Sequence, residues 1–544
     1  MKKIKISLVL VLFFFTAGAF AQLDSNAPRV STKNGVLEGI DESGIDVFKG
    51  IPFAAPPVGN LRWKEPQPVK SWEGVRKADQ FGPNAMQLNV FGDMNFGTDS
   101  MSEDCLYLNI WAPSAAGKEG FPVLVYFHGG GLIAGSGSEP RYAGERMARR
   151  GMIVVTANYR LGIFGFFAHP DLTRESPNHS SGNYGFLDQV AALKWINKNI
   201  EAFGGDPGRV TIAGESAGSV SVSALMCSPL SKNLFAQAIG SSGSLMGALP
   251  PVPQSDAEKT GERFAQKNGY GSVAGLRAVP AEELLKMKAD QFSSVIDGYF
   301  LPEQPVAIYS KGEQAHVPLL VGWNSQEMVP AFLLHGKEPT FANLKEGLTD
   351  TFGDQTDKVL KMYHITDDAS VSGSAGIDLA SDLFIAFSTW KWSDIHAKTG
   401  RKKVFRYRYC HPRPGMVPAM NGKVAGLAGG VQDNEKKNDP QMPKAAGAVH
   451  SADIEYAMGT LPTNRIYDWQ PEDYVVSDVF QMYYANFVKT GNPNGVGVPE
   501  WKAVNNRPVA PVMEIDVNTY EKTDSSLEAR YQFLDGIYFP SGKF

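Results

Sequence analysis

The chain has 544 residues, of which 43% are hydrophobic and 20% are charged, a composition typical of a folded protein and not of a disordered one. The formal net charge of −5 disfavours nucleic acid as a partner, because binding that polyanion requires a basic surface. No CxxC or HExxH motif and no carboxylate-rich calcium loop is present, so we expect no metal and no cofactor. An exported chain could pair two of its three cysteines, but their spacing favours no pair, and we expect free thiols at Cys105, Cys227 and Cys410.

Residues 1–21 are predicted to be a signal peptide. Three lysines precede an apolar run at residues 6–15, and Ala19-Phe20-Ala21 forms a small-x-small cleavage site. The run is shorter than the ~20 residues that a membrane-spanning helix needs, so an anchor is the weaker alternative. We therefore expect an exported, periplasmic or extracellular chain of residues 22–544, without stable membrane insertion. Cleavage would remove three lysines and no acid, which changes the net charge from −5 to −8.

The middle of the chain alternates strand and helix. Residues 122–127, 152–157 and 209–214 are short continuous apolar runs, typical of strands buried on both faces of a sheet. Between the second and third run, apolar residues from Val190 to Phe203 recur at helical spacing, and Gly204 follows as a helix terminator. Strand, helix and strand in this order predict a parallel pair with a right-handed crossover.

Residues 317–322 and 403–409 are predicted to be further strands, so the fold class is α/β with a mostly parallel sheet flanked by helices. Residues 412–448 are rich in Gly, Pro, Asn and Lys and predict a long surface loop. A loop of this length in a compact enzyme is often functional, for example as a lid, but a mobile insertion without a role is the alternative.

Ser216 lies in the sequence GESAGS, directly after a predicted strand and before a predicted helix. This context is that of a nucleophile elbow, in which Gly214 and Gly218 allow strand and helix to approach closely. The elbow places the Ala217 N–H at a helix N-terminus, where a developing negative charge is favoured. An ordinary glycine-rich turn is the alternative.

A second glycine-rich turn, HGGG at residues 128–131, follows the strand at residues 122–127. Glycines let backbone N–H groups converge on one point, so Gly130, Gly131 and Ala217 are candidates for a three-donor oxyanion hole. The alternative is a flexible loop without a catalytic part.

A nucleophilic serine needs a base and an acid that orients the base, and in this arrangement they follow the serine in the order acid, then histidine. Of the nine histidines, His450 lies after the long loop and before an apolar run, where an imidazole could reach the sheet edge. Glu327 follows the strand at residues 317–322 and is the favoured acid. Asp297 is the competitor, although no strand delivers it to the same edge.

The chain resembles the type B carboxylesterase family, which includes cholinesterases and bacterial carboxylesterases. The resemblance runs from about Arg29 to the C-terminus and is carried by the stretches FKGIPFAAPPVGNLRW (48–63), SEDCLYLNIWAP (102–113), HGGG (128–131), NYRLGIFGF (158–166), GNYGFLDQVAALKWINKNIEAFGGDPGRVTIAGESAGS (182–219) and FVKTGNPN (487–494).

The resemblance implies an α/β-hydrolase fold with large loop insertions and the hydrolysis of carboxylic esters. It places the nucleophile, acid and base on Ser216, Glu327 and His450, and the oxyanion donors on Gly130, Gly131 and Ala217. It also implies supporting roles for Glu215, beside the histidine, and Ser242, beside the acid. Arg62 and Glu103 match a structural ion pair without a catalytic part.

Three positions depart from the family pattern, and one of them bears on the substrate. Cys105 is present, but the cysteine with which it often pairs is missing upstream. Residues 82–104 contain no tryptophan, which argues against a choline ester as the substrate, because cholinesterases bind the quaternary ammonium by cation–π contact there. Met328 follows Glu327 where many relatives have glycine.

These residues together predict an exported serine carboxylesterase that acts on a small-molecule or glycan-linked ester. An esterase specialised for feruloyl or acetyl groups of polysaccharides is one alternative. A non-catalytic binding protein on the same fold is the other. With His450 as the base, activity is expected to fall below about pH 6 to 7.

Overall fold

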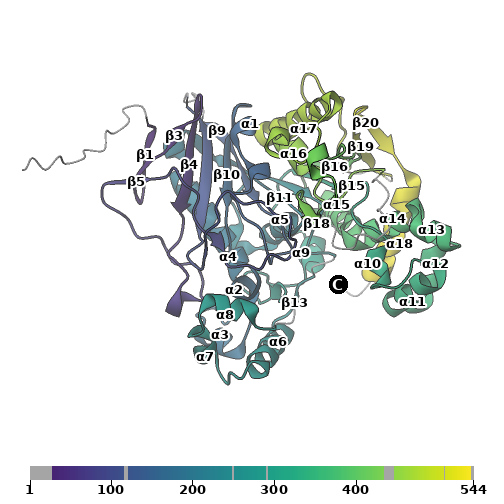
Figure 1. The fold of residues 1–544 in the computed structure, drawn as a ribbon, viewed down its shortest axis with the longest axis horizontal. Helices are drawn as coiled ribbons and strands as arrows, with labels where there is room; N and C mark the ends of the chain where they lie inside the picture. The colour runs from purple at the N-terminus through teal and green to yellow at the C-terminus, as the bar shows by residue number, and fades with distance from the viewer. Residues whose placement is uncertain are drawn as a thin grey trace, which may run out of the picture.

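The protein is described here from a computed structural model that covers residues 27–114, 120–247, 250–288, 292–433, 446–505, 507 and 509–540. The predicted signal peptide and its cleavage site lie outside these ranges. The frame of the described structure is an 11-stranded sheet, in the order β20-β19-β16-β15-β12-β11-β9-β10-β8-β4-β3 (Figure 1). Its strands are β3 (Ile40–Asp41), β4 (Ile45–Pro52), β8 (Tyr107–Pro113), β9 (Phe121–Phe127), β10 (Ile153–Ala157), β11 (Gly205–Glu215), β12 (Gln237–Ser241), β15 (Leu319–Asn324), β16 (Val404–Tyr409), β19 (Pro511–Ile515) and β20 (Tyr520–Thr523).

The centre of this sheet is parallel and its two edges are antiparallel. Each neighbouring pair from β10 through β9, β11, β12, β15 and β16 to β19 is parallel, whereas β8 and β20 pair in the opposite sense. The prediction of a mostly parallel α/β sheet is confirmed. The predicted pairing of β10 with β11 is wrong in one respect, because β9 lies between them and both pair with β9.

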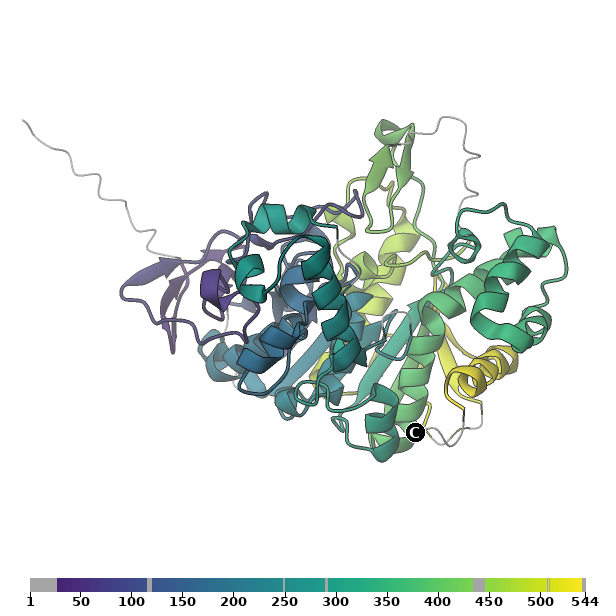
Figure 2. The same ribbon diagram turned by 90° about the horizontal axis from the view of Figure 1, so that it is seen from below.

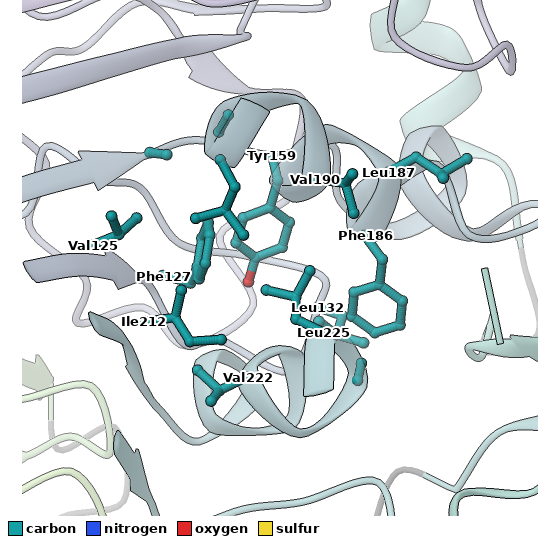
Figure 3. Packing of buried hydrophobic residues seen from close by; sticks show 14 of the residues in the cluster. Val125, Phe127, Leu132, Tyr159, Phe186, Leu187, Val190, Ile212, Val222 and Leu225 are labelled. Carbon is teal, nitrogen blue, oxygen red and sulfur yellow. The ribbon is translucent and has the colours of Figure 1, made fainter. Parts of the chain in front are cut away.

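Helices cover both faces of the sheet because the side chains of each strand alternate between two apolar clusters. In β9, Val123, Val125 and Phe127 belong to the cluster that packs against α4 (Tyr184–Asn199) and α5 (Ala217–Cys227). Figure 3 shows side chains of β9, β11, α4 and α5 around the ring of Tyr159. Leu124 of β9 faces the opposite cluster, with α1 (Glu145–Ala148), α16 (Ile454–Met458) and α17 (Pro471–Thr490).

The predicted helix after β10 is α4 with a 3-10 turn, η3 (Ile200–Phe203), at its end. Gly204 terminates it at φ 83°, a left-handed conformation that glycine adopts without steric cost. The helix therefore ends where the sequence predicts. Strand β11 begins at Gly205, earlier than predicted, and its pairing with β9 shifts register between Gly205 and Val210.

A helical region lies at the end of the molecule beyond β15 (Figure 1). Its apolar cluster combines residues such as Leu344, Val359 and Trp390 with Tyr531 of the C-terminal helix. The elements are α10 (Ala331–Leu334), α11 (Phe341–Phe352), η5 (Gly353–Gln355), α12 (Thr356–Met362), α13 (Asp368–Ser372), α14 (Ser374–Ser381), the π-helical turn η6 (Asp382–Ala386), α15 (Phe387–Thr399) and α18 (Ser525–Tyr538). This region supplies one wall of the site described below.

The remaining elements lie outside the 11-stranded sheet and the helical region. The helices among them are η1 (Gly59–Leu61), η2 (Pro140–Tyr142), α2 (Gly162–Phe166), α3 (Pro170–Glu175), η4 (Pro229–Ser231), α6 (Gln254–Lys267), α7 (Val273–Arg277), α8 (Ala281–Lys286), α9 (Pro305–Lys311), η7 (Pro418–Met420) and η8 (Leu461–Thr463). The strands are β1 (Arg29–Thr32), β2 (Gly35–Glu38), β5 (Val75–Lys77), β6 (Asn84–Ala85), β7 (Met101–Ser102), β13 (Val252–Pro253), β14 (Val295–Ile296), β17 (Lys423–Ala425) and β18 (Val431–Asp433).

The predicted long loop contains β17 and β18, which pair as an antiparallel hairpin and stand out from the body of the molecule (Figure 2). The turn between the two strands is held by the carboxylate of Asp93, which accepts the N–H groups of Ala428 and Gly430 at 2.8 and 3.0 Å. The part of the loop at residues 434–445 lies outside the described residues.

All three cysteines lie in the described chain, and none of them forms a disulfide, as the sequence analysis expects. Cys105 and Cys227 are buried and Cys410 is partly buried. Among the described helices, none is both long enough and apolar enough to cross a bilayer.

Candidate active site

Ser216 lies at the turn between β11 and α5, with φ 54° and ψ −123°. A non-glycine residue rarely adopts positive φ, and this strain is typical of a nucleophile elbow. An added Cβ at Gly214 would lie 2.4 Å from the Gly218 carbonyl carbon, and one at Gly218 would lie 2.1 Å from the Phe127 carbonyl oxygen. Strand and helix therefore approach each other so closely that only glycine fits at both positions.

The structure brings Ser216, His450 and Glu327 into one hydrogen-bonded row. The Oγ of Ser216 lies 3.0 Å from Nε2 of His450, and Nδ1 of His450 lies 2.6 Å from Oε2 of Glu327. His450 and Glu327 are almost completely buried. The carboxylate can accept the Nδ1 proton, which leaves Nε2 as the nitrogen that accepts the proton of the serine hydroxyl.

Glu327 is held by two further donors. Its Oε1 accepts the hydroxyl of Ser242 at 2.5 Å and the backbone N–H of Asn324 at 2.6 Å. Ser242 follows β12 and lies at φ 53°, and its own N–H donates to the Gly322 carbonyl of β15. The position that the sequence assigns to Ser242, beside the acid, is the one that it occupies.

Gly130, Gly131 and Ala217 line the same cavity as Ser216. In the described chain no protein acceptor is paired with these three N–H groups. Gly130 and Gly131 adopt φ 105° and 63°, and an added Cβ on Gly130 would lie 2.2 Å from the Ala134 carbonyl oxygen. Unpaired donors at such a turn can stabilise an oxyanion.

His128, which opens the HGGG turn, supports this turn. Its ring stacks on Tyr159 at 4.4 Å, and the Tyr159 hydroxyl donates to the His128 carbonyl at 2.8 Å. Burial lowers the pKa of His128 to about 4, so this imidazole is neutral at physiological pH.

Glu215 contributes a second buried carboxyl group beside the base. Its Oε1 lies 3.3 Å from Nε2 of His450 and has no hydrogen-bond partner in the described residues. Burial raises the pKa of Glu215, against the lowering effect of His450. Burial lowers the pKa of His450, but Glu215 and Glu327 together outweigh it, so the pKa of His450 lies above its usual value.

The competing acid, Asp297, does not reach this site. It follows the short strand β14, where its carboxylate accepts the N–H of Leu301 at 2.9 Å and the side-chain amide of Asn183 at 2.9 Å. The predicted ion pair of Arg62 and Glu103 forms with two hydrogen bonds of 2.5 and 2.6 Å. Neither residue of this pair lines the cavity at Ser216.

Ser216 opens into a cavity of about 340 Å³ whose lining is mostly apolar. The π-helical turn η6 brings Phe384 edge-on to the His450 ring, at 5.2 Å between centroids, and Leu427 of the long loop lies on another wall. The remaining apolar lining comes from Phe91, Met94, Ala217, Val220, Met328, Phe332, Ile385 and Ala428. Pockets of this kind bind apolar small molecules.

Three contributors to the site are not predicted from the sequence. Asn324 closes a β-strand and has no motif of its own, Phe384 depends on a π-helical turn, and Arg141 reaches the cavity wall from the short 3-10 helix η2. No short motif in the sequence marks any of these three residues.

The parallel sheet, the elbow at Ser216 and the hydrogen-bonded row together define an α/β hydrolase. The sequence model of the carboxylesterase family matches residues 26–534. The chain therefore belongs to the carboxylesterase family and is a carboxylic ester hydrolase.

The chain is also similar to individual proteins that are named as esterases or hydrolases. The chain is 39% identical over 428 residues to the fumonisin B1 esterase of Sphingopyxis macrogoltabida, covering 74% of this chain and 75% of that one. It is 34% identical to the medium-chain fatty acyl-CoA hydrolase precursor of Anas platyrhynchos, with 90% of each chain covered. The solved carboxylesterase of Geobacillus stearothermophilus superposes with a TM-score of 0.77 at 30% identity, over 93% of this chain and all of that one.

Proposed function

We propose that this chain is an exported serine carboxylesterase that works through an acyl-enzyme on Ser216. His450 is the general base and acid, Glu327 orients it, and Gly130, Gly131 and Ala217 form the oxyanion hole. The observation that carries this proposal is the position of the His450 imidazole, 3.0 Å from the Ser216 hydroxyl and 2.6 Å from the Glu327 carboxylate.

In the first half-reaction, Oγ of Ser216 attacks the ester carbonyl carbon while Nε2 of His450 takes the hydroxyl proton. The carbonyl oxygen becomes an oxyanion and accepts hydrogen bonds from the three backbone N–H groups. One such donor typically contributes about 3 kcal/mol to the barrier reduction. When the tetrahedral intermediate collapses, His450 returns the proton to the leaving alcohol, and the acyl group remains on Ser216.

In the second half-reaction, a water molecule takes the place of the alcohol. Nε2 of His450 accepts one of its protons, the resulting hydroxide attacks the acyl carbon, and the same three N–H groups hold the second oxyanion. Collapse breaks the acyl–Oγ bond, His450 gives the proton back to Ser216, and the carboxylic acid leaves. Glu327 stays ionised throughout and stabilises the imidazolium that forms in each half-reaction.

The substrate that we propose is a small-molecule ester with a sizeable apolar part. The apolar lining of the cavity, which includes Phe332, Phe384 and Leu427, supports this class over acetyl or feruloyl groups on a glycan chain. Relatives named for fumonisin B1 and for medium-chain fatty acyl-CoA also support it. The same enzyme is proposed to need no nucleic-acid partner and no membrane insertion. Export is proposed from the signal-peptide pattern of residues 1–21.

The proposal is tested with a fluorophosphonate probe and with 4-nitrophenyl alkanoates. We expect stoichiometric labelling of Ser216, identified by peptide mass, and a burst of 4-nitrophenol followed by slower turnover. Ser216→Ala should abolish both labelling and the burst, while its circular dichroism spectrum stays that of the wild type. Labelling at another residue, or turnover by Ser216→Ala at the wild-type rate, would refute the mechanism.

A further inference from the structure

A second cavity, of about 700 Å³, adjoins the one at Ser216. The two share Arg141 and Ala428 in their linings, so these residues form the partition between them. The catalytic cavity is mostly apolar, whereas the outer one has three arginines and four acids among its lining residues. A substrate that extends past the partition would therefore pass from an apolar into a charged environment.

Arg141 lies in this partition with unused hydrogen-bonding capacity. Its side chain is about nine-tenths buried, and its Nε donates to Glu139 at 2.9 Å. Its Nη1 has no partner in the described chain, and its Nη2 donates no hydrogen bond to any described residue. A guanidinium carries five donors and is always charged, so one that makes a single hydrogen bond can accept an anionic ligand.

Among the other charged residues of the outer cavity, two arginines have no ion-pair partner, whereas most of the acids are paired. Arg146 and Arg465 are exposed on its wall, and neither forms an ion pair with any described residue. The acids are already engaged, as Glu139 pairs with Arg141, Glu145 with Arg149 and Glu455 with Arg413.

The fourth acid of the outer cavity, Asp93, holds the turn between β17 and β18 through Oδ2, and its Oδ1 has no hydrogen-bond partner among the described residues. Arg141, Arg146 and Arg465 therefore all have free donors at this cavity. Arg141 also pairs with Glu139, so Arg146 and Arg465 are the two of them without an acidic partner among the described residues.

We propose that this outer cavity is an anion subsite, and that the preferred substrates are esters that carry a free carboxylate at some distance from the bond that is cleaved. The apolar part of such a substrate would lie between Ser216 and Arg141, and its carboxylate would take hydrogen bonds from Arg141, with Arg146 and Arg465 attracting it at the mouth. This inference rests on the proposed function, because the same serine would cleave the ester.

The test compares kcat/KM for two 4-nitrophenyl esters of equal chain length. One is an alkanoate and the other is the mono-ester of the corresponding dicarboxylic acid, over chains of five, six and eight carbons. A second set carries the carboxylate on the alcohol side, which locates the anion relative to the cleaved bond. The informative quantity is the ratio of kcat/KM for the acidic ester to that for the neutral one.

In the wild type, this ratio should exceed one by roughly tenfold or more at one chain length in either set, as expected for charge-assisted hydrogen bonds. Arg141→Met should lower the ratio by a similar factor. Arg141 is buried and could be needed for folding, so the exposed-residue variants Arg146→Gln and Arg465→Gln provide a second test. Each should lower the ratio by about two- to fivefold. Raising the ionic strength should also lower the ratio.

The matched control is Arg263→Gln, which removes an exposed arginine on α6 that forms no ion pair with any described residue and lines neither cavity. Its ratio should equal that of the wild type. A wild-type ratio of one or less at every chain length in both sets, or a ratio unchanged in all three variants, would overturn the anion subsite. Neutral esters would still be cleaved in that case. Loss of turnover of neutral esters by the wild type would instead refute the proposed function.

Discussion

The backbone N–H of Gln326 donates to the carbonyl of Ala448 at 2.8 Å, which joins the turn that carries Glu327 to the turn that carries His450. Three further hydrogen bonds link the same turns, from Gly447 to the Gln326 side chain, from Ala448 to the Ser325 hydroxyl and from the Asn324 amide to the Val449 carbonyl. Acid and base are therefore fixed relative to each other before substrate binds, and little reorganisation is needed during the reaction.

This arrangement makes the charge of Glu327 decisive. In Glu327→Gln, the amide can present its NH₂ group to His450, which would favour the wrong imidazole tautomer. We expect kcat for a 4-nitrophenyl ester to fall by about 10⁴-fold, with little change in KM. Glu327→Asp keeps the charge and should lose less. A decrease of less than tenfold in Glu327→Gln would exclude Glu327 as the acid that orients His450.

The pH dependence of activity reports on Glu215. A protonated imidazole cannot act as the base, so kcat/KM falls as the pH drops through the pKa of His450. Burial lowers the pKa of His450, but Glu215 and Glu327 raise it by more than burial lowers it. The acidic limb, where activity falls with falling pH, should therefore lie above the range of pH 6 to 7 expected from an ordinary histidine. Glu215→Gln removes one of the two charges and should move the limb to lower pH.

The measurement is a kcat/KM profile from pH 5 to 9 for wild type and Glu215→Gln, with a neutral ester so that the substrate does not titrate. The conservative variant Glu215→Asp, which keeps the charge, should leave the limb closer to that of the wild type. Identical limbs in wild type and Glu215→Gln would mean that Glu215 has no electrostatic effect on the base.

The two glycines of the proposed oxyanion hole should differ in their tolerance of a methyl group. At Gly130 an added Cβ would collide with the Ala134 carbonyl at 2.2 Å, whereas at Gly131 its nearest contact is Ile133 at 3.6 Å. Gly130→Ala must therefore displace the turn, and we expect kcat to fall by about 10² to 10³-fold, the cost of one lost donor. Gly131→Ala bears only the strain of its positive φ and should lose less. Steady-state kinetics of both variants measure the two decreases in kcat. Equal decreases would argue against the different crowding that the structure gives Gly130 and Gly131.

The ion pair of Arg62 and Glu103 should affect stability and not catalysis. Both side chains are largely buried, and Arg62 also donates to the backbone carbonyl of Val279 at 2.6 Å. Removing one partner leaves a buried charge, so Arg62→Ala should lower the free energy of unfolding by about 3 to 5 kcal/mol. Urea denaturation measures this loss. The kcat of the folded variant at low temperature should match the wild type, and a large decrease in kcat would assign Arg62 a second role.

Much of the central sheet can be predicted from local sequence. The runs that form β9, β10, β11, β15 and β16 are apolar because both of their faces are buried, and the period of α4 and its terminal glycine are equally local signals. The order of the strands is not local. Placing β9 between β10 and β11 depends on the packing of whole layers, which a strand–helix–strand pattern does not encode.

The site follows the same division. Ser216 and the HGGG turn lie in short motifs whose glycines are required because backbone segments approach each other closely there. These motifs therefore predict both features from the sequence. Phe384 faces His450 only because a π-helical turn adds a residue between α14 and α15, and no simple pattern predicts such a turn. The sequence does not predict a role for Arg141 either, because that role depends on guanidinium donors that no neighbouring residue accepts.

The free cysteines have a practical consequence for producing this enzyme. Burial raises the pKa of Cys105 and Cys227, and it raises that of Cys410 to about 11, so little reactive thiolate is present at neutral pH. All three cysteines are free thiols, so the fold has no disulfide bond for which an oxidant would be needed. A version beginning at Gln22 should therefore mature in the reducing cytoplasm of an expression host, and dithiothreitol in storage buffers should leave its melting temperature unchanged.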